Sequence, residues 1–444
     1  MAVSLVPVLF LIDYLQGKRF SIKQLLPKIP FILLAIATGY YAVVVQSKEA
    51  INEFNTFTLL QRFMFAAYGF VLYMAKIFVP YYLSAFYPYP NVNDLGNIPS
   101  FFYFAPFVAI AIVTIPVFLI YRFRRIHLPV VIFGFAFYFF TIALVLQFIS
   151  VGSAIMAERY SYVPYIGIMY AVAYGLNSYF SGKKNVILII GVATSLSLAY
   201  LCYNRVQVWK NNETLWTDVI EKYPHRIEVA YKNRGNYYAQ AGKLDKAYED
   251  HIVLMNMKTR DAGVYTNFAN LCGLRRNFDK ALEAYTHALE LKKSDNYDIY
   301  LNRAITYSMM KQYDKALTDF EVADKMKPDD EKLYMNRAYV YLTVGMYEKS
   351  IFDYDFLVKR FPDDKMHYFN RGLAKFNLKR FEDATQDFTE AVKLDPAYKE
   401  AYFNLSVSYN QLGKYKEALA YAQKAKSLGH SINDSYFKEI EAKM

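Results

Sequence analysis

A glutamate and an arginine stand together just before a long apolar run, in the segment Ala157-Glu158-Arg159-Tyr160-Ser161-Tyr162-Val163-Pro164. Charged side chains at a membrane surface are costly unless they are paired or serve a function. The fork of an arginine guanidinium suits a phosphate group, both in charge and in geometry. We therefore consider Glu158 and Arg159 as candidates for binding a lipid-linked phosphate. The alternative is a structural ion pair or an interfacial anchor.

A second set of charges recurs in the C-terminal half at a fixed separation of 16 residues. An arginine and an aspartate occur together four times, and at the two other equivalent places both are absent. This joint presence predicts a partly buried ion pair between two helices. The alternative is that the two residues are independent surface charges. The four pairs are Arg234 with Asp250, Arg303 with Asp319, Arg337 with Asp353, and Arg371 with Asp387.

An asparagine occupies the same place six times in this half, one residue before the arginine position. An amide side chain both donates and accepts hydrogen bonds, so it can match a peptide unit without reading its side chains. The alternative is a consensus asparagine that makes only local hydrogen bonds. The six candidates are Asn233, Asn267, Asn302, Asn336, Asn370 and Asn404.

The elements that must position these residues follow from a period of 34 residues. Two small residues recur in register, and apolar or aromatic residues accompany each of them. The first small residue is Gly235, Ala269, Ala304, Ala338, Gly372 and Ser406, and the second is Ala247, Ala281, Ala316, Ser350, Ala384 and Ala418. Pairs of antiparallel helices with this spacing are typical of tetratricopeptide repeats, which stack into a superhelix. On that basis the asparagines resemble the ladder of O-GlcNAc transferase repeats, which implies a concave groove that grips an extended peptide.

The N-terminal half differs in charge and hydropathy. Residues 1–205 hold 14 Lys and Arg against 5 Asp and Glu, and the basic residues flank apolar runs. That arrangement suits a membrane and not nucleic acid. Runs long enough to span a bilayer are expected at about 29–46, 101–121, 128–150, 160–180 and 185–203.

Topology depends on residues 55–88, which are apolar and aromatic but contain Arg62 and Lys76. If this stretch crosses the membrane, the first two basic loops lie on opposite sides. If it lies along the outer interface or re-enters, all the basic loops face the cytoplasm, as positive loops prefer. We adopt the second interpretation, which predicts a multi-pass protein with the repeats outside the cytoplasm, in a periplasm or lumen.

Other kinds of site have little support. The six histidines and the two cysteines, Cys202 and Cys272, show no metal-ligand spacing and no disulfide framework. Neither a nucleotide-binding nor a hydrolase motif is present. No metal and no nucleic-acid partner is therefore expected.

The order of these features resembles one family. It runs from a multi-span region through the Pro80–Pro90 stretch, Ala-Glu-Arg-Tyr-x-Tyr-x-Pro, a last span and Trp209…Trp216…Pro224 to the repeats. It is similar to the C-terminal part of the membrane glycosyltransferases of the GT-C type that carry tetratricopeptide repeats, the TMTC-like O-mannosyltransferases. The resemblance implies a polyprenyl-phosphate sugar donor, a membrane lipid environment, and protein or peptide partners. The family's first outer loop, with its acidic catalytic residues, is missing, so Met1 looks like the interior of a longer protein and no catalytic residue is assigned.

The sequence thus predicts an all-α protein: a multi-span transmembrane region followed by an α-solenoid of tetratricopeptide repeats. The expected divisions are a truncated GT-C-like region at 1–205, a linking half-repeat at 206–227, six repeats at 228–432 and a capping helix at 433–444. Two functions stay open. One is a protein O-glycosyltransferase whose repeats recognise the acceptor, and the other is a non-catalytic, membrane-anchored scaffold for protein–protein interaction.

Overall fold

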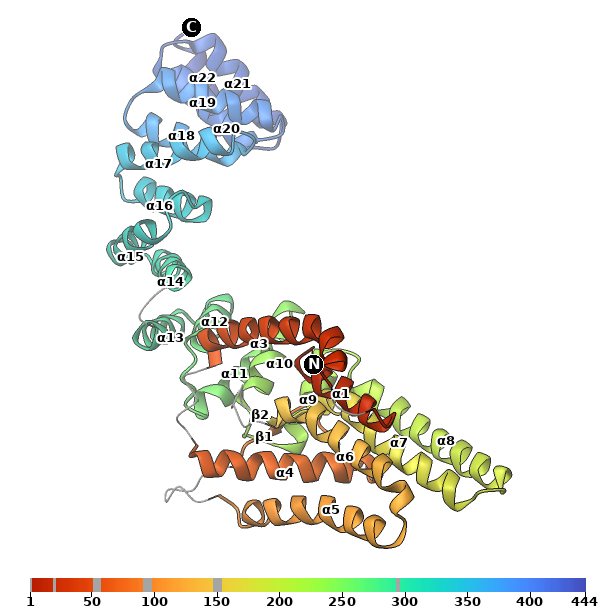
Figure 1. Ribbon diagram of the computed structural model, residues 1–444. Coiled ribbons are helices and arrows are strands. Elements are labelled where there is room, and N and C mark those ends of the chain that lie inside the picture. The colour runs from red at the N-terminus through yellow and green to blue at the C-terminus, as the bar shows by residue number, and fades with distance from the viewer. Residues whose placement is uncertain (1, 19–20, 51–56, 91–97, 147–153, 293–295) are drawn as a thin grey trace. The chain divides into compact units, whose positions relative to one another are not determined.

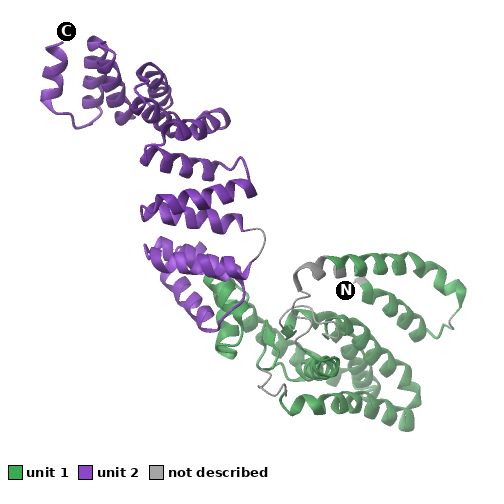
Figure 2. Ribbon diagram, turned by 90° about the vertical axis from the view of Figure 1, so that its left-hand side faces the viewer, with its two compact units in different colours: residues 1–237 green, residues 238–444 purple. Residues whose placement is uncertain are grey.

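The computed structural model describes residues 2–18, 21–50, 57–90, 98–146, 154–292 and 296–444. The chain forms two compact units, residues 1–237 and residues 238–444 (Figure 2). The described residues are helical apart from one short antiparallel pair of strands, together with turns and loops. The all-α prediction, with a solenoid of tetratricopeptide repeats in the C-terminal region, is confirmed.

The first unit contains ten α-helices and the strand pair among its described residues (Figure 1). They are α1 (Ala2–Leu15), α2 (Ile22–Leu25), α3 (Ile29–Ala50), α4 (Leu59–Phe78), β1 (Tyr87–Pro88), α5 (Phe101–Phe123), α6 (Leu128–Ile142), β2 (Ala154–Met156), α7 (Tyr162–Tyr179), α8 (Lys184–Val208), α9 (Asn212–Lys222) and α10 (Glu228–Gln240).

Among the residues that the structure describes, four helical segments are long and apolar enough to cross a membrane. They are Ile22–Tyr41, Phe101–Phe123, Arg125–Val145 and Lys184–Val208. These correspond to four of the five expected runs, although the first begins earlier than expected and the last continues to Val208. The fifth run forms helix α7, which is not among the four, because tyrosines and a polar Asn177 lower its hydropathy. Residues 147–150 of the third run lie outside the described residues.

Helix α4 carries the core of the first unit. The side chains of Phe65 and Tyr73 are almost fully buried where α4 packs beside α5 (Figure 1). The Tyr73 hydroxyl donates to the carbonyl of Ala157 and accepts from its amide, each at 2.9 Å. These two hydrogen bonds tie α4 to the segment that carries Glu158. The interfacial position expected for residues 55–88 remains a prediction.

Helices α6 and α7 cross at two glycines. A Cβ atom on Gly134 would lie 2.8 Å from the carbonyl oxygen of Gly167, and a Cβ on Gly167 would lie 2.8 Å from that of Gly134. Backbone therefore meets backbone at this crossing, as is common where small residues line contacts between membrane helices.

The repeats are pairs of helices that follow one another in the chain. The five pairs that lie wholly within the second unit pack on each other. The pairs are α10 with α11 (Leu244–Asn256), α12 (Ala262–Leu274) with α13 (Phe278–Leu291), α14 (Tyr297–Met309) with α15 (Tyr313–Met326), α16 (Glu331–Thr343) with α17 (Tyr347–Arg360), α18 (Lys365–Asn377) with α19 (Phe381–Leu394), and α20 (Lys399–Gln411) with α21 (Tyr415–Ser427). Helix α22 (Asp434–Glu441) follows, and its Ile440 is fully buried.

The turn inside each pair has one residue in the left-handed region. Its φ angle lies between 58° and 83° in all six turns, which repeat at the same steps as the small residues. Three of these residues are glycine, which adopts this conformation readily, and three are lysine or arginine. They are Gly242, Arg276, Lys311, Gly345, Lys379 and Gly413.

Candidate functional site

The structure separates the two charged residues that the sequence placed together. Glu158 is buried, with 9% of its surface exposed, and its Oε2 accepts a hydrogen bond from Nε of Arg205 at 3.0 Å. Arg159 is exposed and lies over the ring of Tyr160, whose hydroxyl accepts from it at 3.1 Å. The ion pair of Glu158 is therefore made with helix α8 and not with the adjacent arginine.

Arg205 continues the contact to helix α9. Its Nη1 donates to Oδ2 of Asp218 at 2.9 Å, and Oδ1 of Asp218 pairs with Lys222 on the same helix α9. Lys222 also donates to the carbonyl of Leu83 at 2.6 Å. A chain of charges thus joins residue 158, the end of α8, α9 and the Pro80–Pro90 stretch. Sequence reasoning missed these residues, since only the i,i+4 spacing of Asp218 and Lys222 gave a local signal.

A cavity of about 200 Å³ opens beside this chain, between α4, α7 and α8. Lys76, Glu158 and Arg205 contribute its charged lining. Within the described residues, the buried Oε1 of Glu158 and Nη2 of Arg205 have no hydrogen-bond partner. Burial raises the pKa of the Glu158 carboxyl above its ordinary value, although Arg205 acts in the opposite direction. Such a site could hold a group that both donates and accepts hydrogen bonds.

The structure brings three of the four predicted Arg–Asp pairs into contact. Arg303 binds Asp319 through Nε and Nη2 at 2.7 and 2.8 Å, and the Arg337–Asp353 distances are 2.8 and 2.9 Å. Arg371 binds Asp387 in the same two-pronged way. All three aspartates are buried. The fourth predicted pair joins residues of different compact units, Arg234 and Asp250, and remains a prediction.

Each of these arginines also makes a third contact, which the sequence did not reveal. Its Nη1 donates to a polar side chain on the second helix of the preceding repeat. The acceptors are Thr286 at 3.3 Å for Arg303, Asp324 at 2.9 Å for Arg337, and Asp355 at 2.8 Å for Arg371. In the first unit, Arg234 donates to Thr217 of α9 at 3.0 Å in the same manner. This contact supports the assignment of α9 as half of a repeat.

The six asparagines lie at equivalent places on the first helices, and all of them are half-buried. Nδ2 of Asn336 and of Asn404 donates to the carbonyl four residues earlier in the same helix. Oδ1 of Asn302 accepts from Lys332 of the next repeat at 3.2 Å. We call these six residues the asparagine ladder.

Metal binding has no structural support in the described part of the chain, where no group of three or more His, Cys, Asp or Glu side chains could hold an ion.

Comparison with known families identifies the repeats. Two tetratricopeptide-repeat models match, one at residues 262–295 and 297–330 and the other at 335–398 and 371–431. The repeats are tetratricopeptide repeats. The matched residues all follow residue 261, so the comparison concerns the repeat region and not the apolar N-terminal half.

The similar proteins share only part of the chain. Heat shock protein STI1 of Saccharomyces cerevisiae is 31% identical over 71 residues, which are 16% of this chain and 12% of that protein. MamA from Desulfovibrio magneticus RS-1 is 22% identical with a TM-score of 0.37, over 38% of this chain and 94% of MamA. YrrB, described as a tetratricopeptide-repeat protein with an unusual peptide-binding site, is 23% identical with a TM-score of 0.37, over 40% and 92%.

Proposed function

We propose that this chain is a membrane protein whose tetratricopeptide repeats bind extended segments of partner proteins. The observation that carries the proposal is the asparagine ladder, which repeats in register with the helices. Half-buried amides at a constant helical position present one donor–acceptor group per repeat. An extended peptide also offers donors and acceptors at regular intervals, so the ladder suits its backbone.

In two of the ladder residues the local contacts leave the amide oxygen available. In Asn336 and Asn404 the amide nitrogen is held by the helix, and Oδ1 accepts no hydrogen bond within the described residues. An amide fixed in this way loses little rotamer freedom on binding, which lowers the entropic cost of association. The four apolar segments of the membrane half would anchor the array at a bilayer.

The test replaces three ladder residues with alanine. Peptides selected from a random library on the wild-type chain should bind the Asn302→Ala/Asn336→Ala/Asn370→Ala variant at least about tenfold more weakly, since each lost hydrogen bond contributes about 0.5–1.5 kcal/mol. Asn377→Ala is the matched control, because Asn377 lies on α18 outside the ladder and bonds only its own helix. Equal affinity of the triple variant would contradict the proposal.

A second function is favoured by the cavity at Glu158. A buried carboxylate with two cations at the ends of apolar helices fits the head group of a lipid-linked sugar phosphate, the donor class that the resemblance to TMTC-like glycosyltransferases implies. In this hypothesis the repeats present the acceptor protein for O-glycosylation. Arg159, exposed beside the cavity segment, is the residue expected to contact the phosphate.

Binding of a fluorescent polyprenyl phosphate to the full chain tests this second function. Arg159→Ala should weaken binding without changing the melting temperature, because the Arg159 side chain makes only local contacts with Tyr160. Arg122→Ala is the control, because Arg122 is exposed in the last turn of α5. If wild-type protein and both variants bind the probe equally, the donor hypothesis fails and the scaffold remains.

A further inference from the structure

Two repeats lack the Arg–Asp pair, and the one formed by α12 and α13 replaces it with the smallest side chain at the aspartate position. In the repeats with Arg303, Arg337 and Arg371, the guanidinium fills the junction between three helices. It contacts an aspartate of its own repeat and a polar side chain of the preceding one. The repeat formed by α12 and α13 has Phe268 at the arginine position and Ala284 at the aspartate position.

The second helix of the preceding repeat, α11, also lacks the polar side chains that make the third contact elsewhere. Thr286 and Asp355 stand five residues after the second small residue of their repeats, and Asp324 stands eight after its own. On α11 the corresponding residues are Ile252 and Met255. All positions that form the polar junction elsewhere are therefore apolar here.

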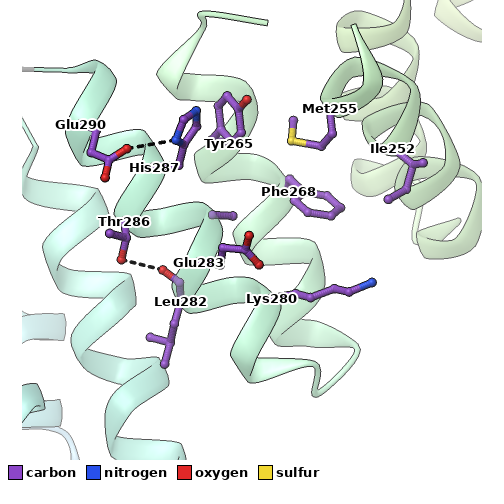
Figure 3. Close-up of a pocket in the computed structure, with 11 residues that line it drawn as sticks. Ile252, Met255, Tyr265, Phe268, Lys280, Leu282, Glu283, Thr286, His287 and Glu290 are labelled. Atoms are coloured by element: carbon purple, nitrogen blue, oxygen red, sulfur yellow. Dashed lines mark hydrogen bonds and ion pairs between the residues drawn. The ribbon is translucent and has the colours of Figure 1, made fainter. Parts of the chain in front are cut away.

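The result is an open cavity of about 700 Å³ between α11, α12 and α13 (Figure 3). Ile252 and Met255 form one wall, Tyr265 and Phe268 lie opposite, and Ala284 lies on the floor. In the other repeat without the pair, Leu405 and Tyr421 occupy the two positions, and the Tyr421 ring stacks on Tyr409 with centroids 5.4 Å apart. A large ring stands at the aspartate position there, whereas Ala284 has only a methyl group at the same position.

The rim of the cavity carries two glutamates and one lysine, Lys280, all of them on α13. Glu283 and Glu290 are exposed and lie two turns apart along α13, with His287 between them at 3.1 Å from Oε2 of Glu290 (Figure 3). At the position of Glu290, three other repeats carry a lysine: Lys325, Lys359 and Lys393. The apolar cavity and the reversal of charge thus coincide at one junction.

We propose that this cavity, which we call the Phe268 pocket, is a second docking site that receives an amphipathic helix of a partner protein. The helix would insert apolar side chains between α11 and α13 and place Lys or Arg against Glu283 and Glu290. A groove bordered by two helices accepts a third helix through its i, i+3, i+4 and i+7 side chains. The residues that line the pocket do not include any of the six ladder asparagines, so this site is distinct from the asparagine ladder.

The probe is a labelled helical peptide of about 18 residues with leucines at helical spacing and lysines on both flanks. Its fluorescence anisotropy is measured with the full chain in amphipol, which leaves no free micelles to absorb the peptide. Ala284→Tyr, which copies the filled junction of the Tyr421 repeat, should weaken binding at least about tenfold, as one buried apolar side chain is lost.

Charge reversal provides a test that does not touch the core. Glu283→Lys/Glu290→Lys should weaken binding of the lysine peptide and strengthen binding of the same peptide with glutamate flanks. Glu348→Lys, an exposed charge in another repeat, should change neither. The Asn302/Asn336/Asn370 alanine variant should bind the helical peptide normally, so failure of the ladder and failure of the pocket are distinguishable.

Three results would overturn the proposal. Binding that Ala284→Tyr and the charge reversal both leave unchanged would place the peptide elsewhere. Equal binding of the lysine-flanked and glutamate-flanked peptides would show an apolar surface without selectivity. A wild-type dimer that Ala284→Tyr converts to a monomer in light scattering would make a second copy of this chain the occupant.

Discussion

The guanidinium of Arg337 and the carboxylate of Asp353 form two parallel hydrogen bonds, and both side chains are more than nine-tenths buried. This geometry joins the two helices of one repeat, and the third contact of Arg337, to Asp324, joins that repeat to the preceding one. A group that connects three helices affects the cooperativity of the whole array, because each repeat contacts only its neighbours.

Removing one partner of this pair should cost more than removing both. Arg337→Leu leaves the Asp353 carboxylate buried without its cation, and such a loss costs about 3–5 kcal/mol. Arg337→Leu with Asp353→Ala should restore part of that stability. Thermal melts of the double-mutant cycle measure the difference. Lys443→Leu, which breaks an exposed pair with Glu439, should leave the melting temperature unchanged. Additive effects at Arg337 and Asp353 would count against coupling.

The stability of the repeats should fall below neutral pH because of His367. Its imidazole is fully buried, neither ring nitrogen has a hydrogen-bond partner in the described residues, and burial lowers its pKa from 6.5. Asp364 and Glu331 face it at 3.8 and 3.9 Å and oppose that change, and the rings of Tyr354 and Phe361 lie beside it.

A lowered pKa means that the unfolded chain takes up the proton first, so the stabilisation is present above about pH 6.5 and is lost as the pH falls below it. The melting temperature of the wild-type protein should therefore decrease between pH 7.5 and pH 5.5. The decrease should be about 2 °C smaller for His367→Phe over the same range. The half-buried His287, which lies beside Glu290, gives the matched control His287→Phe. Identical pH profiles for wild type and His367→Phe would show that another group is responsible.

The glycine crossing of α6 and α7 should not tolerate a methyl group. In Gly167→Ala the new Cβ would meet the Gly134 carbonyl and the Phe137 side chain at 2.8 Å, and the backbone atom cannot move away cheaply. The expected loss is about 1–3 kcal/mol. Gly175→Ala on the same helix has open space around it and should keep or raise the melting temperature in detergent. If both variants melt alike, the two helices are not held at this crossing.

Topology is tested by a reporter that is active only in the cytoplasm. The basic loops at 16–28, Arg122–Arg125 and Lys183–Lys184 predict that the repeats lie on the opposite side of the membrane. A fusion after Met444 should therefore be silent, while a fusion after Lys184 should be active. Strong activity after Met444 would contradict both this topology and the interfacial position of residues 55–88.

The sequence by itself determined the repeats and their helices. Two small residues per period must lie where helices cross, and the fully buried Ala304 and Ala316 do so. The joint presence of Arg and Asp was also sufficient to predict contacts such as Arg303 with Asp319, because both positions belong to one local pair of helices.

Only the tertiary structure decided the partners that come from elsewhere in the chain. The sequence left open whether Glu158 and Arg159 form an ion pair, whereas helix packing brings Arg205 to Glu158 from 47 residues away. The contacts between neighbouring repeats, and the cavity left at Phe268 and Ala284, depend on how one repeat packs on the next. Periodicity places residues on helices, but the space between helices is set by the side chains of several helices together.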